Sequence, residues 1–194
     1  LRELGQKYQR PVDLATVPEP EWDAIAAHGV DAVWFMGVWE RSPAGIEIAM
    51  RNPGLLEDFR RALPDFAASD NVGSPYCVRR YAVDKHLGGP EGLAAARRML
   101  RERGLRLILD FVPNHVAPDH PWVIDHPEYF VQGNADDARI DPASFVVVGG
   151  KVFACGRDPY FPAWPEVVQL DASRTDVRQA ITRVEERIAD RWDG

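Results

Sequence analysis

The sequence predicts an α/β fold: a consecutive part of a (β/α)8 TIM barrel that carries a protruding irregular and β-rich insertion. Two apolar runs are typical of strands in a parallel sheet: residues 32–39, which are continuously apolar, and residues 105–112, which alternate at first and are expected to be buried on both faces. Helical patterns over residues 19–28 and 89–103 precede them, and this alternation favours parallel strands joined by right-handed crossovers. Two strands alone would leave both edges of a sheet open, so a longer barrel is the simplest architecture.

The first helix is predicted from Glu19 to His28. Trp22, Ile25 and Ala26 recur there at helical spacing. Gly29 follows directly and suits the left-handed conformation that ends many helices. The apolar strand over residues 32–39 comes next.

Three segments separate the two predicted strands. Residues 53–66 have the apolar stripe of an inserted helix, and residues 74–84 are predicted to be a loop along the ligand side of the barrel. The helix up to Arg103 has Pro90 at its start and Gly104 at its end, as expected from their backbone preferences.

The strand over residues 105–112 ends in a polar cluster. Pro113 cannot donate to a sheet ladder, so Asp110, Asn114 and His115 are expected at or just past the C-terminal end of the strand. In parallel α/β folds that end carries the ligand site.

The rest of the chain is less regular. Residues 116–170 form a stretch too long for a structureless loop, so a small subdomain is predicted there, with a hairpin over residues 145–153 around a Gly-Gly turn. A last helix is expected from Ser173 or Thr175 to Trp192. These patterns divide the chain into residues 1–115 (first part of the barrel), 116–172 (insertion) and 173–194 (barrel helix before an absent fourth strand).

The amino-acid composition disfavours some classes of function. The 194 residues are 45% hydrophobic and 27% charged, with a formal net charge of −7, which disfavours nucleic-acid binding. No apolar run approaches the ~18–20 residues of a membrane span. Cys77 and Cys155 define neither a disulfide framework nor a metal-ligand spacing, so a cytoplasmic location is expected, unless the chain is trimmed at its N terminus.

The polar cluster belongs to a longer pattern. Residues 110–115, Asp-Phe-Val-Pro-Asn-His, resemble the third-strand motif Asp-x-Val-x-Asn-His of the α-amylase family, glycoside hydrolase family 13. Further matching segments are Gly29–Trp34 (second strand), Ser74-Pro75-Tyr76 with Tyr81 (tyrosine loop), Asp84 with Leu87 and Gly88, and Gln169-Leu170-Asp171 near the end of the insertion.

The resemblance implies a role for each matching side chain. Tyr76 would stack on the sugar at the cleaved bond, and His115 would hydrogen-bond one of its hydroxyls. Asp110 would orient an arginine on the next strand. Asn114 and Asp171 match positions that bind a structural calcium in many members, and no other cofactor is implied.

The implied function is that of a retaining glycoside hydrolase that acts on α-glucosidic bonds, with an α-glucan or maltooligosaccharide as substrate and the remainder of the barrel as partner. The nucleophile and the acid/base are expected outside this segment, because the family carries them on later strands, so the segment alone is expected to be inactive. One departure is Arg80, where the family often has aspartate.

Three alternatives stay open. One is an α-glucosyl transferase of the same family. Another is a non-catalytic maltooligosaccharide-binding scaffold built on a degraded barrel. The last is an unrelated TIM-barrel enzyme, which a late phosphate-binding loop would favour.

Overall fold

The computed structural model describes residues 1–189, which form two compact units. The first unit contains Leu1–Glu40, Tyr81–Phe111 and the described residues 185–189, and the second contains Arg41–Arg80 and Val112–Val184. The part of the chain that the structure describes contains no helix with the length and apolar character of a membrane span.

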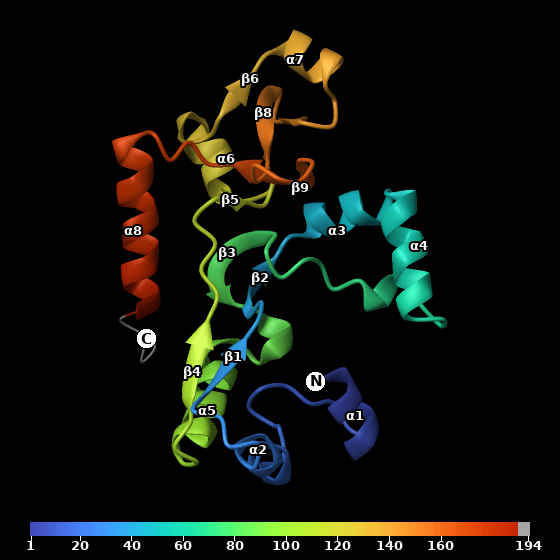
Figure 1. The fold of residues 1–194 in the computed structure, drawn as a ribbon, viewed down its shortest axis with the longest axis vertical. Coiled ribbons are helices and arrows are strands. Elements are labelled where there is room, and N and C mark those ends of the chain that lie inside the picture. Colours follow the sequence, from blue (N-terminus) through green and yellow to red (C-terminus); the bar gives the residue numbers. More distant parts are fainter. Residues whose placement is uncertain (190–194) are drawn as a thin grey trace. The chain divides into compact units, whose positions relative to one another are not determined.

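The first unit holds a short parallel sheet and its helices (Figure 1). Its complete elements are α1 (Arg2–Tyr8), α2 (Glu19–Ala26), β1 (Ala32–Phe35), the 3₁₀ helix η2 (Lys85–Leu87), α5 (Gly89–Arg101) and β4 (Arg106–Leu109). Strands β2 (Trp39–Arg41) and β3 (Val78–Val83) pair with each other, and both contain residues of each unit.

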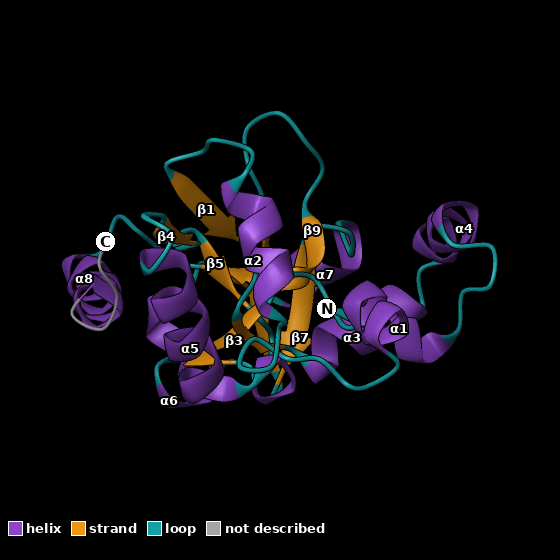
Figure 2. Ribbon diagram, turned by 90° about the horizontal axis from the view of Figure 1, so that it is seen from below, coloured by secondary structure: helices purple, strands orange, loops and turns teal. Residues whose placement is uncertain are grey.

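Strands β1 and β4 are parallel neighbours, as the alternation of strands and helices predicted. Their register runs from Ala32 opposite Arg106 to Phe35 opposite Leu109. Helix α5 packs against β4 (Figure 2). Its side chains Leu93, Ala96 and Leu100 are fully buried. The predicted helix ending at Arg103 is therefore confirmed as α5.

The two apolar runs are less uniform than predicted. The run over residues 32–39 is interrupted, because Gly37 has a positive φ of 70° and the chain resumes extended structure only at Trp39. Burial on both faces was also wrong, since Trp34 is 55% exposed and Ile108 is 48% exposed. The described residues supply no layer that covers this face of the two-stranded sheet.

Asp110 joins these two strands where they end. Its carboxylate accepts hydrogen bonds from the indole Nε1 of Trp34 at 2.7 Å and from the backbone nitrogen of Gly37 at 2.6 Å. The Trp39 indole donates to the Asp110 backbone carbonyl at 2.8 Å. The side chain is buried, so these donors replace water and fix the turn at Gly37 against the end of β4.

The second unit is mainly antiparallel. Its sheet has the order β5-β9-β8-β6, with β7 pairing on β8. The elements are α3 (Pro43–Met50), α4 (Pro53–Ala62), η1 (Ala68–Asp70), β5 (His115–Val116), α6 (Pro121–Asp125), η3 (Pro127–Tyr129), β6 (Gln132–Gly133), α7 (Ala135–Ile140), β7 (Phe145–Val148), β8 (Lys151–Gly156) and β9 (Trp164–Gln169).

The predicted hairpin is confirmed, with Val148 opposite Lys151 across a turn of two glycines that both have positive φ. The core of this unit is an apolar cluster. Its buried members are Val116, Val123, Phe130, Phe153, Val168, Leu170 and Val177.

One local prediction was wrong, and one helix was not predicted. Residues 78–83 form strand β3 instead of a loop; Val78 and Val83 are buried, and the charged Arg79 and Arg80 between them hid the strand pattern. Helix α3 was not expected, and it begins where the Ser42 hydroxyl accepts a hydrogen bond from the Gly45 nitrogen at 2.8 Å.

The last helix, α8 (Thr175–Ala189), begins as predicted and buries Val177, Ala180 and Val184. Trp192 and the expected start of a fourth strand at Asp193-Gly194 lie outside the described residues. The boundaries at residues 115 and 172 stay predictions, since the compact units group residues 41–80 with the segment that follows Phe111.

His120 should make the protein sensitive to acid. Burial lowers its pKa from 6.5 to about 4, although neighbouring Asp119 opposes the shift and Arg80 and Arg79 add to it. The folded state therefore resists protonation, so stability is unaffected above pH 6.5 and is lost as the pH falls toward 4. This site alone should cost about 2 kcal/mol between pH 7 and pH 5.

The test is urea denaturation of wild type and of His120→Asn at both pH values. His120 accepts a hydrogen bond from the Trp122 nitrogen at the start of α6, and asparagine can keep that cap. The variant should lose markedly less stability at pH 5 than wild type does. Equal losses would show that His120 is not the acid-sensitive group.

Asp110 should be a major determinant of stability in the first unit. Replacement by alanine removes the acceptor of two hydrogen bonds, from Trp34 Nε1 and from the Gly37 nitrogen, and we expect a loss of about 1.5–3 kcal/mol in the free energy of unfolding. The matched control is Trp34→Phe, which removes one hydrogen bond from a half-exposed indole and should cost less. An Asp110→Ala variant as stable as wild type in urea would contradict this assignment.

Candidate functional site

A pocket of about 280 Å³ lies within the second unit and contains both predicted sugar-binding residues. Its lining combines aromatic, aliphatic and a few polar side chains. The lining residues are Ser74, Tyr76, Val112, His115, Trp164, Glu166 and Val167.

Strand pairing positions His115. Residues His115 and Val116 form β5, opposite Gln169 and Val168 of β9. The His115 ring lies edge-on to the Trp164 ring, with 5.5 Å between the ring centroids. Gly156 leaves room for this arrangement, because a Cβ there would lie 3.0 Å from the Cβ of His115.

His115 is neutral at physiological pH. Burial lowers its pKa below 6.5, and a hydrogen bond to the Tyr76 backbone carbonyl opposes that effect only in part. The Asn114 amide nitrogen lies 3.1 Å from His115 Nδ1. A neutral imidazole has one donor and one acceptor nitrogen, which suits recognition of a hydroxyl.

Two aromatic rings complete the apolar part of the lining. Tyr76 is 37% exposed, and its backbone nitrogen donates to the Ser74 hydroxyl at 3.3 Å, which shapes the turn. Trp164 begins β9 and is half-buried. Aromatic faces of this kind cover the apolar face of a sugar ring.

Trp164 and Glu166 were not expected from the sequence. They occupy alternate positions of β9, a few residues before the Gln169-Leu170-Asp171 match. The adjacent β-branched residues Val167 and Val168 were the available signal for a strand. It could not show that β9 pairs with β5, which places both side chains beside His115.

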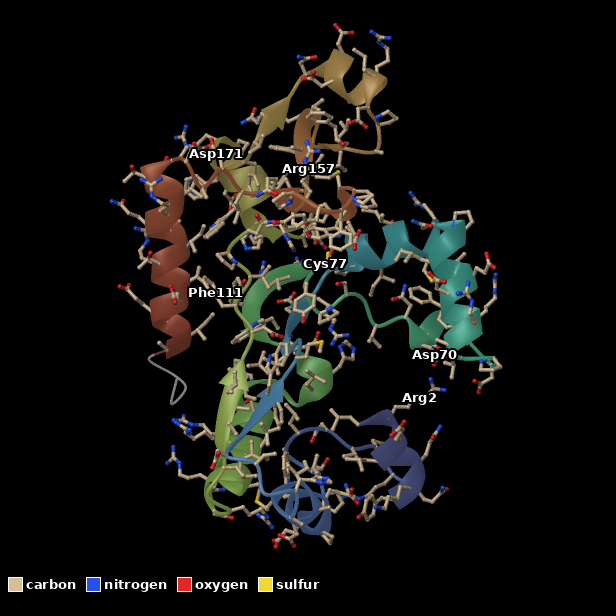
Figure 3. All side chains as sticks on the ribbon, viewed as in Figure 1. Arg2, Asp70, Cys77, Phe111, Arg157 and Asp171 are labelled. Atoms are coloured by element: carbon tan, nitrogen blue, oxygen red, sulfur yellow. The ribbon has the colours of Figure 1, made fainter. Side chains whose placement is uncertain are left out.

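Asn114 and Asp171, the predicted calcium ligands, are engaged with protein groups. The Asn114 Oδ1 accepts a hydrogen bond from Gln169 Nε2 at 3.0 Å, and the Asp171 Oδ1 accepts one from the Ser173 nitrogen at 3.1 Å. Figure 3 shows Asp171 just before helix α8. Calcium takes six to eight oxygens. Within residues 1–189 no group of three or more histidine, cysteine, aspartate or glutamate side chains could hold a metal. Calcium at this place stays a prediction.

Asp110 belongs to the first unit, and its carboxylate binds Trp34 and Gly37 as described above. Its predicted partner, an arginine of the next strand, would come from beyond the described residues. Arg80, at the position where the family often has aspartate, is exposed in β3.

No protein-family model matches the chain. Similar curated proteins are the amino acid transporter heavy chain SLC3A1 of Mus musculus and the α-1,4-glucan:maltose-1-phosphate maltosyltransferase of Burkholderia pseudomallei. The transporter heavy chain is 30% identical over 57% of this chain, and the match covers 12% of its own length. The maltosyltransferase is 30% identical over 63% of this chain, and the match covers 9% of its own length. The chain thus spans about a tenth of these proteins.

Solved structures resemble nearly the whole chain. An α-amylase from Lactobacillus plantarum matches 93% of it with a TM-score of 0.60 at 20% identity, and the α-glucosyl transfer enzyme XgtA matches 92% with a TM-score of 0.65 at 16% identity. The chain covers 33% and 31% of those two chains. Its fold is therefore that of a part of their α/β barrel architecture, and the resemblance of this chain to the α-amylase family is confirmed.

Proposed function

We propose that the chain is part of the catalytic barrel of an enzyme that acts on α-glucosidic bonds, and that its own contribution is to bind the sugar. The observation that carries this proposal is the pocket, which groups Tyr76, His115 and Trp164 in the second unit. Aromatic rings would hold a glucose ring by its apolar face, while the neutral imidazole would bond a hydroxyl at the ring edge.

A reaction that retains the configuration at the sugar carbon needs catalytic groups that this pocket does not contain. A retaining glycosidase needs two carboxyl groups about 5–5.5 Å apart, one as nucleophile and one as acid/base. The pocket lining contains a single carboxylate, Glu166. The pocket therefore supports binding and orientation of the substrate, and the covalent glycosyl-enzyme would form on residues that the pocket does not contain.

Hydrolysis is the proposed reaction, and glucosyl transfer by the same intermediate is the alternative. The similar proteins include both an α-amylase and a maltosyltransferase by name. The two reactions differ only in whether water or a sugar hydroxyl attacks the intermediate. Product analysis with and without an added acceptor sugar separates them.

A non-catalytic role is the second candidate, because one of the similar proteins is named as a transporter heavy chain. In that case the same pocket would bind maltooligosaccharide without turnover. Calorimetric binding together with a starch-hydrolysis assay on the complete polypeptide separates the two: a scaffold binds sugar and releases no reducing ends.

The proposal predicts a specific loss at His115. In the complete enzyme, His115→Ala and His115→Gln should lower kcat/KM for maltooligosaccharides at least roughly tenfold, equivalent to about 1.4 kcal/mol, because a hydrogen bond to the substrate is lost. Thermal denaturation should show that the glutamine variant remains folded.

The control is His86→Ala, which alters a histidine of the first unit whose side chain is 97% exposed. It should leave the kinetics unchanged. A His115→Gln enzyme with wild-type kcat/KM would remove His115 from the site.

A further inference from the structure

Cys77 follows directly after the pocket residue Tyr76, and the proposed function gives it no role. It is a free cysteine and is 2% exposed. Its buried neighbours are Ala117 and Val167, and Trp164 packs against this cluster. Because Val167 and Trp164 both line the pocket, the cysteine is packed against the pocket wall.

The thiol is hydrogen-bonded to the strand that carries Trp164. Cys77 Sγ donates to the Glu166 backbone carbonyl at 3.0 Å. Burial raises the pKa of the thiol to about 12, so the thiol stays protonated and remains a donor at physiological pH. The Cys77 side chain therefore connects the segment after Tyr76 to β9.

The bonded carbonyl lies in an irregular stretch of β9. Cys155 of β8 is opposite Val168, whereas the next residue, Gly156, is opposite Trp164, so the pairing skips the residues between those two positions of β9. Glu166 is one of the skipped residues. A bulge of this kind interrupts the regular ladder of the two strands. The thiol thus holds β9 at the point where its pairing with β8 is interrupted.

Helix α3 packs closely against the same sulfur, and Figure 3 shows Cys77 close to α3 and β9. A Cβ at Gly45 would lie 2.6 Å from Cys77 Sγ, so a larger residue there would displace the sulfur. The Ser42 hydroxyl fixes this glycine, because it accepts from the Gly45 nitrogen at 2.8 Å and donates to Asp119 Oδ1 at 2.6 Å. Close packing therefore keeps the thiol next to its acceptor.

The backbone of the same segment is bonded to the predicted sugar-binding histidine. The Tyr76 backbone carbonyl accepts a hydrogen bond from the His115 ring. The segment Tyr76-Cys77 is thereby connected to β5 through its backbone and to β9 through its thiol.

We propose that Cys77 is a positioning residue for the sugar site: its thiol holds this segment against β9 and sets how Tyr76 lies relative to Trp164. This inference rests on the proposed function and deepens it. Cys77 is not among the lining residues, so it acts through Tyr76. An aromatic ring stacks well on a sugar only when neighbouring contacts already hold it in place.

The test measures kcat/KM for maltotetraose in the complete enzyme. Cys77→Ala lacks the donor and should lower kcat/KM roughly three- to tenfold, as expected for the loss of one hydrogen bond. Cys77→Ser keeps a donor at this position and should stay within about twofold of wild type. In a Tyr76→Ala background, Cys77→Ala should cause no further loss, because the residue through which it acts is already absent.

The matched control is Cys155→Ala, which alters the other free buried cysteine of the second unit. This residue lies on β8 and is not among the pocket lining, so the variant should lose thermal stability and keep wild-type kcat/KM. If Cys77→Ala does not fold, Gly45→Ala replaces it. Alanine suits the helix while its Cβ displaces the sulfur, so kcat/KM should fall in the same way.

Three results would overturn the positioning role and leave the proposed function intact. The first is wild-type kcat/KM in Cys77→Ala, or in Gly45→Ala where that variant replaces it. The second is an equal loss from Cys77→Ala with and without Tyr76. The third is a Cys77→Ser enzyme as impaired as the alanine variant. A wild-type enzyme that neither hydrolyses maltotetraose nor transfers glucosyl groups from it would instead overturn the proposed function.

Discussion

The hydrogen bonds of Asp110 hold together the part of the fold on which the family resemblance depends. The buried Asp110 carboxylate accepts one hydrogen bond from the Trp34 side chain of β1 and one from the Gly37 backbone N–H in the turn that follows β1. The turn holds Gly37 in a left-handed conformation, with a φ of 70°, which glycine adopts without strain. The parallel pair of β1 and β4 and the position of Asp110 therefore depend on each other through these hydrogen bonds.

The second unit builds its sheet and the candidate pocket from short segments of the chain. Two-residue β5 would not be stable as an isolated strand, but it pairs with β9, and β9 pairs with β8. Apolar side chains from several elements cover this sheet, including the fully buried Phe153 and Val168. The same pairing places His115 beside Trp164, so the core and the candidate site share one scaffold.

The electrostatics of that site follow from burial. Removal from water keeps His115 neutral, while Glu166 carries the one formal charge of the lining. The proposed sugar-binding role depends on this neutral imidazole and on the two aromatic rings beside it.

Sequence alone determined the features that depend on short-range pattern. Helix α5 was predictable because its apolar stripe, Pro90 and Gly104 act within a few residues of each other. The hairpin around Gly149-Gly150 was predictable for the same reason, and the hexapeptide at residues 110–115 was specific enough to indicate the family. The positions of Tyr76 and His115 in one pocket had been implied by that resemblance alone.

Tertiary structure decided what depends on pairing between distant segments. Strand β3 has arginines in its centre, and only its pairing with β2 makes it a strand. Trp164 and Glu166 lie about fifty residues after His115, so nothing local could place them beside it. The exposure of Trp34 and Ile108 likewise follows from which neighbours are present, not from their own hydrophobicity. Local patterns fix backbone conformation through short-range sterics and capping, whereas a binding site is defined by long-range contacts that only the folded chain creates.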